Sequence, residues 1–324
     1  MPYIMGIVQG GTKTDIVIAD DQGNILSAAN DRDWTPVQGE RRAVRMLRIR
    51  YAAEKAAAEA GISLGGIDRV SGSCNGADWP FEYPIGRKNI RNTLGVQQVR
   101  LYNDCIGALR GGTEVRGRDC AVLCLGTGGN CAVFNREGEE YIYAYYLKSI
   151  HQGAGAIGRF VFEAVFDAQA GLAPPTALTG LLLEATGYAS VEDLFIAVTT
   201  GPTEDAKPWT PVYKQFSPLL FQGVGRGDPV SLQYLENFCQ GLARYVIVAA
   251  KKLGMQQRDI MVVLSGGVLK SGSIMVELIQ KNLALALPGA RCVNAEFEPV
   301  VGALLMEYDQ IYPDGVPEQV MQRL

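Results

Sequence analysis

The sequence predicts an α/β protein of two domains, each built on a mixed β-sheet with helices on its faces. Two observations carry this prediction. The chain opens with three strands and a helix, and a second run of three strands starts near residue 120. In both runs a glycine-rich turn joins the first strand to the second. Such an opening, followed by helices, is typical of mixed-sheet α/β domains.

In the first half, apolar runs bounded by glycine and polar turns predict strands over 3–9, 14–19 and 25–29. An alanine-rich, charged stretch over about 39–60 predicts a helix that ends at Gly61. Further strands are expected over 68–73 and 99–103, with a loop between them. A helix is expected to begin at Cys105.

In the second half, strands are expected over 120–125, 130–135 and 140–147. Asp228 followed by Pro229 is a typical helix start, and an apolar stripe then runs to Gly254 through Leu235, Phe238, Leu242, Tyr245 and Ala249. A buried strand over 259–264 follows. We therefore expect domains at 1–115 and 116–324, with a helical subdomain over about 160–225. The last segment, about 310–324, is expected to pack back on the N-terminal domain.

The composition limits the class of partner. The 324 residues are 48% hydrophobic and 20% charged, with a net charge of −4. This weak acidity argues against nucleic-acid and anionic-membrane partners. The sequence shows no signal peptide and no apolar run long enough for a membrane span. Seven scattered cysteines in apolar runs indicate reduced, buried thiols, so we expect a cytoplasmic protein.

Four glycine-bearing turns follow predicted strands, at 10–13, 126–129, 153–155 and 265–267. Glycine lets backbone N–H groups approach a phosphate closely, although a plain hairpin turn also requires glycine. The first turn is not a P-loop, because Thr12 precedes Lys13 and a strand follows where a P-loop needs a helix. Two such hairpins, one in each domain, instead indicate the phosphate clamp of actin-like domains.

An acidic candidate follows the strand over 99–103. Asp104 comes at the strand's end, just before a helix, and such positions face the ligand crevice in open α/β sheets. An ionised carboxylate there is suited to accept a hydroxyl proton as a general base. Taken alone, Asp104 is better explained as a helix N-cap without chemistry.

Six motifs, in order along the chain, resemble the N-acetylglucosamine kinase and BadF/BadG/BcrA/BcrD ATPase group of the actin-like superfamily. They lie at Gly10–Asp15, Asn75–Pro80, Asn103–Asp104 with Ala108, Gly126–Cys131, Ser265–Val268 and Pro299–Ala303. Six motifs in order are far more specific than one. The resemblance implies two actin-like, ribonuclease H-like domains with the active cleft between them.

The resemblance also implies an ATP-dependent kinase of an amino sugar or related small molecule, with ATP and Mg²⁺ as cofactors and Asp104 as general base. The implied nucleotide-binding residues are Gly10, Gly11, Thr12, Lys13, Gly126, Thr127, Gly128, Gly266 and Gly267. The implied substrate-binding residues are Asn103, Asp104, Asp78, Thr127, Asn130, Tyr146, His151 and Gln152. No residue is expected to bind metal directly, since Mg²⁺ arrives with ATP and water near Gln9 and Asp104. A homodimer is implied as well.

Three places depart from the family pattern. Gln9 stands where the family carries an acid, and a neutral amide cannot replace a carboxylate's charge near hydrated Mg²⁺. His151 and Gln152 stand where two acids are usual, and Tyr146 lies near the position of a Gly-Trp-Gly sugar motif. His151 is the one histidine in the chain, and its charge can change near neutral pH. These exchanges favour either a different, acidic substrate or a loss of turnover.

Two alternatives to an active kinase therefore stay open. One is a catalytically weak or inactive relative that binds nucleotide or sugar as a sensor. The other is an ATPase that activates a reductase, which requires a cluster-binding cysteine at a dimer interface. If the chain is a weakened kinase, replacing Gln9 by aspartate is expected to tighten its dependence on Mg²⁺.

Overall fold

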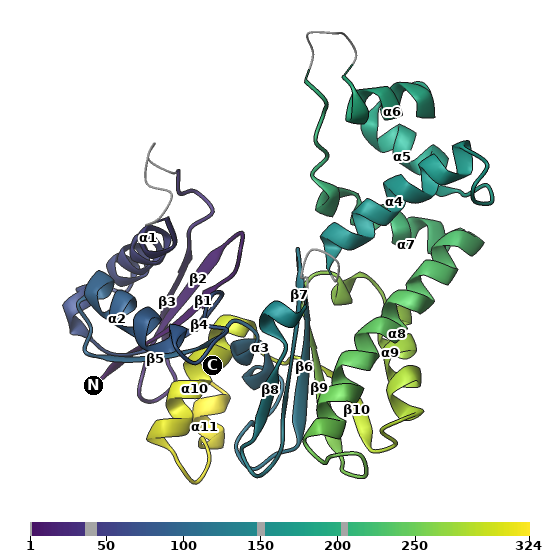
Figure 1. The fold of residues 1–324 in the computed structure, drawn as a ribbon. Helices are drawn as coiled ribbons and strands as arrows, with labels where there is room; N and C mark the ends of the chain where they lie inside the picture. The colour runs from purple at the N-terminus through teal and green to yellow at the C-terminus, as the bar shows by residue number, and fades with distance from the viewer. Residues whose placement is uncertain (1, 36–43, 148–152, 202–206) are drawn as a thin grey trace. The chain divides into compact units, whose positions relative to one another are not determined.

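The computed structural model describes residues 2–35, 44–147, 153–201 and 207–324 (Figure 1). It contains two five-stranded sheets with helices packed on them. The chain divides into two compact units, which are Met1–Val122 with Phe134–Ile142 and Val293–Leu324, and Leu123–Val133 with Tyr143–Cys292. The predicted fold class, mixed sheets flanked by helices, is confirmed.

The first sheet lies in the first unit and has the strand order β3-β2-β1-β4-β5. Its strands are β1 (Tyr3–Gln9), β2 (Thr14–Asp20), β3 (Ile25–Asn30), β4 (Ile67–Cys74) and β5 (Gln98–Asn103). β2 pairs antiparallel with β1 and β3, whereas β4 pairs parallel with β1 and β5. In this register Gln9 lies beside Cys74, and Cys74 lies beside Asn103. The carboxyl ends of the three parallel strands therefore meet at one edge of the sheet.

Helices cover both faces of this first sheet (Figure 1). α1 (Val44–Glu59) and α2 (Glu82–Leu94) bury an apolar face against the strands, with four alanines of α1 in that core. On the other face lies α10 (Pro299–Ile311), together with the short helices α3 (Ile106–Arg110) and α11 (Glu318–Met321). The hydroxyl of Tyr312 donates to the carbonyl of Asp21 at 2.9 Å, which ties the end of α10 to the turn after β2.

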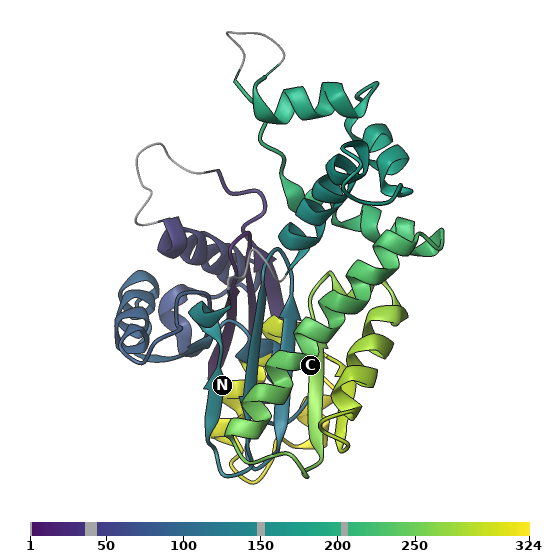
Figure 2. The same ribbon diagram turned by 45° about the vertical axis from the view of Figure 1, so that its right-hand side comes forward.

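The second sheet has the strand order β10-β9-β6-β7-β8. Its strands are β6 (Cys120–Leu125), β7 (Gly129–Phe134), β8 (Glu140–Ile142), β9 (Ile260–Ser265) and β10 (Ala290–Asn294). The long helix α8 (Pro229–Lys252) packs against α9 (Ser273–Ala284), and Figure 2 shows the two side by side. The predicted start of α8 is confirmed, since Asp228 is the N-cap and Pro229 occupies the first turn.

The helix-rich segment of the second unit holds α4 (Ala154–Gln169), α5 (Leu178–Thr186), α6 (Val191–Thr199) and α7 (Ser217–Gly225). Aromatic rings join these helices. Phe162 of α4 contacts Tyr213 and Phe216 edge-on, with ring centroids 5.4 Å and 5.0 Å apart. Edge-to-face pairs of this kind stabilise a small core beyond the area that they bury.

Three predicted elements differ from the structure. Residues 75–97 contain α2, where a loop was expected, and Pro84 in its first turn is compatible with a helix. The strand expected over 140–147 ends at Ile142, because the chain turns into a 3-10 helix over Ala144–Tyr146. The helix expected over 39–60 is α1, while residues 36–43 lie outside the described part of the chain. Among the described helices, none is long and apolar enough to cross a bilayer.

Candidate active site

Three predicted loops come together at one edge of the first sheet. The hairpin turn at 10–13 follows β1, the loop over 75–80 follows β4, and Asp104 follows β5. These three strands are parallel neighbours in register, so their carboxyl ends carry all three loops. This is the edge at which open α/β sheets bind their ligands. The first unit therefore brings together the hairpin turn at 10–13, the loop over 75–80, called here the substrate-type loop, and the carboxylate of Asp104.

The hairpin turn presents polar groups to solvent. The N–H of Gly10 donates to the carbonyl of Lys13 at 3.0 Å and closes the turn, while Gly11 and Thr12 are exposed. The ammonium of Lys13 forms an ion pair with Asp15 at 2.6 Å and keeps about half of its surface exposed. The backbone N–H of an exposed glycine, a hydroxyl and an ammonium group are hydrogen-bond donors that can bind a phosphate.

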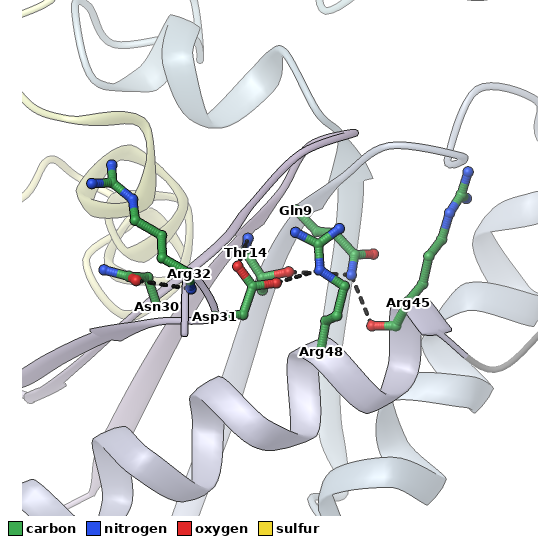
Figure 3. Close-up of polar contacts among 7 residues, drawn as sticks. All are labelled: Gln9, Thr14, Asn30, Asp31, Arg32, Arg45 and Arg48. Atoms are coloured by element: carbon green, nitrogen blue, oxygen red, sulfur yellow. Dashed lines mark hydrogen bonds and ion pairs between the residues drawn. The ribbon is translucent and has the colours of Figure 1, made fainter. Parts of the chain in front are cut away.

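Buried polar residues support the hairpin from below (Figure 3). The carboxylate of Asp31 accepts from the backbone N–H of Thr14 at 2.8 Å and forms an ion pair with Arg48 of α1. The amide nitrogen of Gln9, which is 2% exposed, donates to the carbonyl of Arg45 at 2.8 Å. Its amide also reaches the hydroxyl of Thr14 at 3.4 Å. α1 is thereby fixed to the base of the hairpin.

The Gln9 side chain therefore acts as a hydrogen-bond donor in this structure. A carboxylate at this position could not donate to the carbonyl of Arg45, so the departure from the family's acid has a structural consequence. The donor end of the Gln9 amide points at α1. In the described residues, no three acidic, thiol or imidazole groups cluster as a metal site requires. The route by which Mg²⁺ enters, with ATP and water near Gln9 and Asp104, stays a prediction from the sequence.

Asn103 links the substrate-type loop to the turn that carries Asp104. Its side chain is fully buried. The amide nitrogen donates to the carboxylate of Asp78 at 2.6 Å and to the carbonyl of Ala77 at 3.2 Å. The amide oxygen accepts from the backbone N–H of Cys105 at 3.2 Å. The Asn103 side chain thus holds both the loop that carries Asp78 and the backbone of Cys105, the residue after Asp104.

Asp104 itself is half-buried in the turn between β5 and α3. The Asp104 carboxylate also affects the pKa of the Cys74 thiol. Burial first, and then the Asp104 carboxylate, raise the pKa of Cys74 to about 12. The register of β4 and β5 places Asn103 beside Cys74, so Asp104 follows next to the end of β4 and the loop that carries Asp78.

A second set of turns surrounds the end of β6 in the second unit. The N–H of Gly126 donates to the carbonyl of Gly128 at 2.9 Å, which closes the predicted phosphate turn. The carbonyls of Gly126 and Thr127 accept from Ala154 and Gly155, at 2.9 and 3.1 Å, in the first turn of α4. Gly126 and Thr127 are exposed. The turn at 126–129 and the turn at 153–155 therefore lie against each other.

The turn at 265–267 joins the same place. Gly266 has a φ of +105°, and a Cβ built on it would lie 2.2 Å from the carbonyl oxygen of Leu125. Only glycine fits this approach. The N–H of Val268 donates to that same carbonyl at 3.2 Å. Three of the four predicted glycine turns are thus brought together in the second unit.

The remaining predicted substrate residues are placed less completely. The side chain of Asn130, on β7, accepts from the backbone N–H of Cys131 at 2.8 Å and of Ala144 at 3.3 Å. Asn130 therefore positions the backbone two residues before Tyr146. The side chain of Tyr146 is exposed. His151 and Gln152 lie outside the described residues.

Two residues of the site were not predicted from the sequence. Glu82 accepts from the N–H groups of Asp78 and Trp79 at 2.9 and 2.8 Å, and so holds the substrate-type loop. Glu82 is the first residue of α2 and reaches back to the loop before it, and no capping pattern in the sequence marks this contact. Arg45 donates to the carbonyl of Asn75 at 3.2 Å, across 30 residues of sequence. No local pattern predicts that contact.

Comparison with known proteins identifies the family. Over 322 residues the chain is 27% identical to an N-acetyl-D-glucosamine kinase of Dictyostelium discoideum, covering 93% of this chain and 96% of that protein. It is 23% identical to an N-acetylmuramic acid/N-acetylglucosamine kinase of Clostridium acetobutylicum, covering 94% and 98%. A solved structure from Chromobacterium violaceum, assigned as an N-acetylglucosamine kinase, superposes with a TM-score of 0.67 at 18% identity, covering 94% and 99%. Residues 5–306 match the model of one family, and the chain belongs to the BadF/BadG/BcrA/BcrD ATPase family.

Proposed function

We propose that the protein is an ATP-dependent phosphotransferase that phosphorylates a hydroxyl of an amino sugar. One observation supports this proposal above the others. Three parallel strands in register carry a phosphate-type hairpin, the Asp78 loop and the Asp104 turn to a single edge. The two relatives named above act on amino sugars, according to their names, and they cover nearly the whole chain.

The proposed reaction assigns a role to each loop. Asp104 takes the proton of the sugar hydroxyl, whose oxygen then forms a bond to the γ-phosphorus of ATP while ADP leaves. The hydroxyl of Thr12 and the ammonium of Lys13 bind the phosphate oxygens. In the second unit, the turns at 126–128 and 266–267 bind the nucleotide. These residues act by positioning and by neutralising charge, which is most of what phosphoryl transfer demands of a protein.

The sugar is proposed to contact the loops that carry Asp78, Asn130 and Tyr146. Asn103 is fully buried and bonded to Asp78, so its proposed contribution is to hold this loop. Thr127 is exposed and lies in the nucleotide turn, where its hydroxyl can serve either ligand. The roles of His151 and Gln152 stay predictions from the sequence.

The test is a panel of amino sugars and neutral sugars incubated with ATP and Mg²⁺. We expect sugar-dependent release of ADP, together with a product heavier than the sugar by one phosphate, for at least one amino sugar. A chelator such as EDTA should abolish the release, because the nucleotide is proposed to bring the ion. ADP release that does not depend on any sugar would contradict the proposal.

A second candidate is a relative that binds nucleotide or sugar without turnover. Gln9 favours it, since an amide supplies no negative charge near the nucleotide's cation. Calorimetric binding of ATP and of an amino sugar, with no ADP release from both together, would support this candidate. The homodimer implied by the resemblance is proposed as well, and light scattering of the purified chain tests it.

A further inference from the structure

Gln9, Asn75 and Arg45 form a closed ring of hydrogen bonds at the edge of the first sheet. The N–H of Asn75 donates to the carbonyl of Gln9 at 2.8 Å. The guanidinium of Arg45 donates to the carbonyl of Asn75 at 3.2 Å. The Gln9 amide donates to the carbonyl of Arg45 at 2.8 Å, as Figure 3 shows. Each residue both gives and accepts one bond, so the position of Arg45 is fixed from two sides.

The guanidinium of Arg45 occupies space that a glycine leaves open. Gly76 has a φ of +81°, and a Cβ built on it would lie 2.2 Å from the Nη1 atom of Arg45. The absence of a side chain there lets the guanidinium lie across the loop. Arg45 is nevertheless exposed to solvent. The N–H donors of its guanidinium are therefore held in a defined position and remain accessible to solvent.

The bond to Asn75 uses one of the five N–H donors of the Arg45 guanidinium. In the described part of the chain, no carboxylate lies within ion-pair distance of Arg45. The nearby acids have other partners, since Asp78 accepts from Asn103 and Glu82 accepts from backbone N–H groups. Arg45 is thus a positioned cation that forms no ion pair with a described residue.

The strand before this cation's loop pairs with the strand before the proposed base, since Cys74 of β4 lies in register beside Asn103 of β5. The pKa of the Cys74 thiol is raised first by burial and then by Asp104, while Arg45 lowers it, so both charges are felt at that one sulfur. Cys74 directly precedes Asn75, the residue to which Arg45 donates. The guanidinium accordingly lies on the 75–80 loop, at the same edge of the sheet as Asp104.

We propose that Arg45 binds a carboxylate carried by the acceptor, so that the substrate class is an amino sugar with an acidic substituent. This inference rests on the proposed function, because it concerns the acceptor of that reaction. A guanidinium matches a carboxylate with two parallel hydrogen bonds. The hairpin at 10–13 carries its own cation, Lys13, for the nucleotide. Arg45 is bonded instead to Asn75 in the substrate-type loop. Gln9 acts as a positioning residue, because its amide holds the backbone of Arg45.

The experiment compares three acceptors on the full chain with ATP and Mg²⁺. They are N-acetylglucosamine, the same sugar with a carboxyethyl ether at O3, and the primary amide of that ether. The acid and the amide have nearly the same shape and differ in charge. The variants are Arg45→Gln, Arg45→Lys and, as a matched control on the same helix, Arg50→Gln. Arg50 is exposed and pairs with Glu54 at 2.8 Å.

We expect wild type to prefer the acid over its amide by about 10- to 100-fold in kcat/KM, the size of a charge-assisted hydrogen-bonded pair. In Arg45→Gln this ratio should fall to about 1, mainly through the KM of the acid, and in Arg45→Lys it should be intermediate. Arg50→Gln should keep the wild-type ratio, because an exposed ion pair on a helix contributes little.

Three results would overturn the inference. They are a wild-type ratio near 1, a ratio that survives in Arg45→Gln, and a loss in Arg45→Gln that falls on the KM of ATP instead of the acid. If no acceptor gives ADP, the proposed function fails, and calorimetric binding of the three sugars then decides the inference separately. Equal binding of acid and amide would refute it, and tighter binding of the acid that is lost in Arg45→Gln would support it.

Discussion

Asn103 and Gln9 show how single side chains organise this site. Both are buried amides at the carboxyl ends of the parallel strands β1 and β5, which flank β4, and the nitrogen of each donates to another loop or helix. An amide can donate and accept at once, which a carboxylate cannot do. These two residues therefore position the loops, and Asp104 remains as the ionisable group proposed for the chemistry.

The first prediction concerns Asp104. Replacing it with asparagine keeps the shape and removes the proton acceptor, so kcat should fall by about 100- to 10,000-fold. The affinity for ATP should change little, because the nucleotide is proposed to bind other turns. Stopped assays of sugar phosphate and calorimetry of ATP binding measure the two quantities. Turnover near the wild-type rate would show that another group is the base.

The second prediction concerns Gln9. Glutamate at this position cannot donate to the carbonyl of Arg45, and it places a charge in a site that is 2% exposed. The free energy of unfolding should fall by about 1 to 3 kcal/mol. Urea titration measures it, with Gln98→Glu as the matched control, because Gln98 is an exposed residue of the edge strand β5. Equal stability of the two variants would mean that the Gln9 amide is not holding α1.

At the scale of elements, local sequence predicted strands better than it predicted α2. Pro84 and Gly86 lie within that helix, and neither residue type favours a helix. A Cβ built on Gly86 would lie 2.3 Å from the side chain of Leu101, so this glycine serves close packing between α2 and β5. The third strand of the second run was also predicted too long, because the chain turns into a 3-10 helix after Ile142. The N–H of Tyr143 still bonds the carbonyl of Cys131, but Tyr146 already bonds back to Tyr143.

The N-cap of α8 gives the third prediction. Asp228 accepts from Ser231 in its own helix, and from Thr176 and Ala177 at the start of α5. Replacing it with alanine should lower the free energy of unfolding by about 2 to 4 kcal/mol, since a cap is lost and buried donors lose their acceptor. Asp228→Asn, which keeps one acceptor oxygen, should lose less. Equal losses in the two variants, measured by urea titration, would contradict this account.

The same cap predicts a pH dependence. Burial raises the pKa of Asp228, but the hydrogen bonds from Ser231, Ala177 and Thr176 lower it more, so the pKa lies below its ordinary value. A lowered pKa in the folded state means that the stabilisation is present above the ordinary pKa and is lost as the pH falls through the lowered one. The difference in stability between wild type and Asp228→Ala should therefore shrink in acid. A difference that stays constant down to pH 2 would contradict this assignment.

The glycine turn after β9 gives the fourth prediction. Alanine at Gly266 would clash with the backbone of Leu125 and occupy a φ of +105°, so the free energy of unfolding should fall by about 2 to 4 kcal/mol. A Cβ at the neighbouring Gly267 meets no atom within 4 Å, which makes Gly267→Ala the matched control. Thermal unfolding without ligand compares the two. If Gly266→Ala were as stable as Gly267→Ala, close packing of the turn against β6 would be wrong.

For the whole molecule, the order of motifs along the chain was sufficient to predict the fold class and the family. The turns at 126–129 and 265–267 follow β6 and β9, which are neighbours in one sheet. The contact between Arg45 and Asn75 could not be predicted, because it joins residues 30 positions apart through a loop that only the folded sheet positions. The buried partners of Gln9 and Asn103 were missed for the same reason. Sequence identifies which groups are present, whereas long-range packing decides which of them remain available to a ligand.

The central claim is that the loops at the edge of the first sheet transfer phosphate to an amino sugar with Asp104 as the base. The most direct measurement is ADP release with an amino sugar, ATP and Mg²⁺, run beside a control without sugar and beside Asp104→Asn. We predict release that requires the sugar, yields one sugar phosphate for each ADP and is lost in the variant. Release that is equal without sugar, or that persists in Asp104→Asn, would contradict the claim.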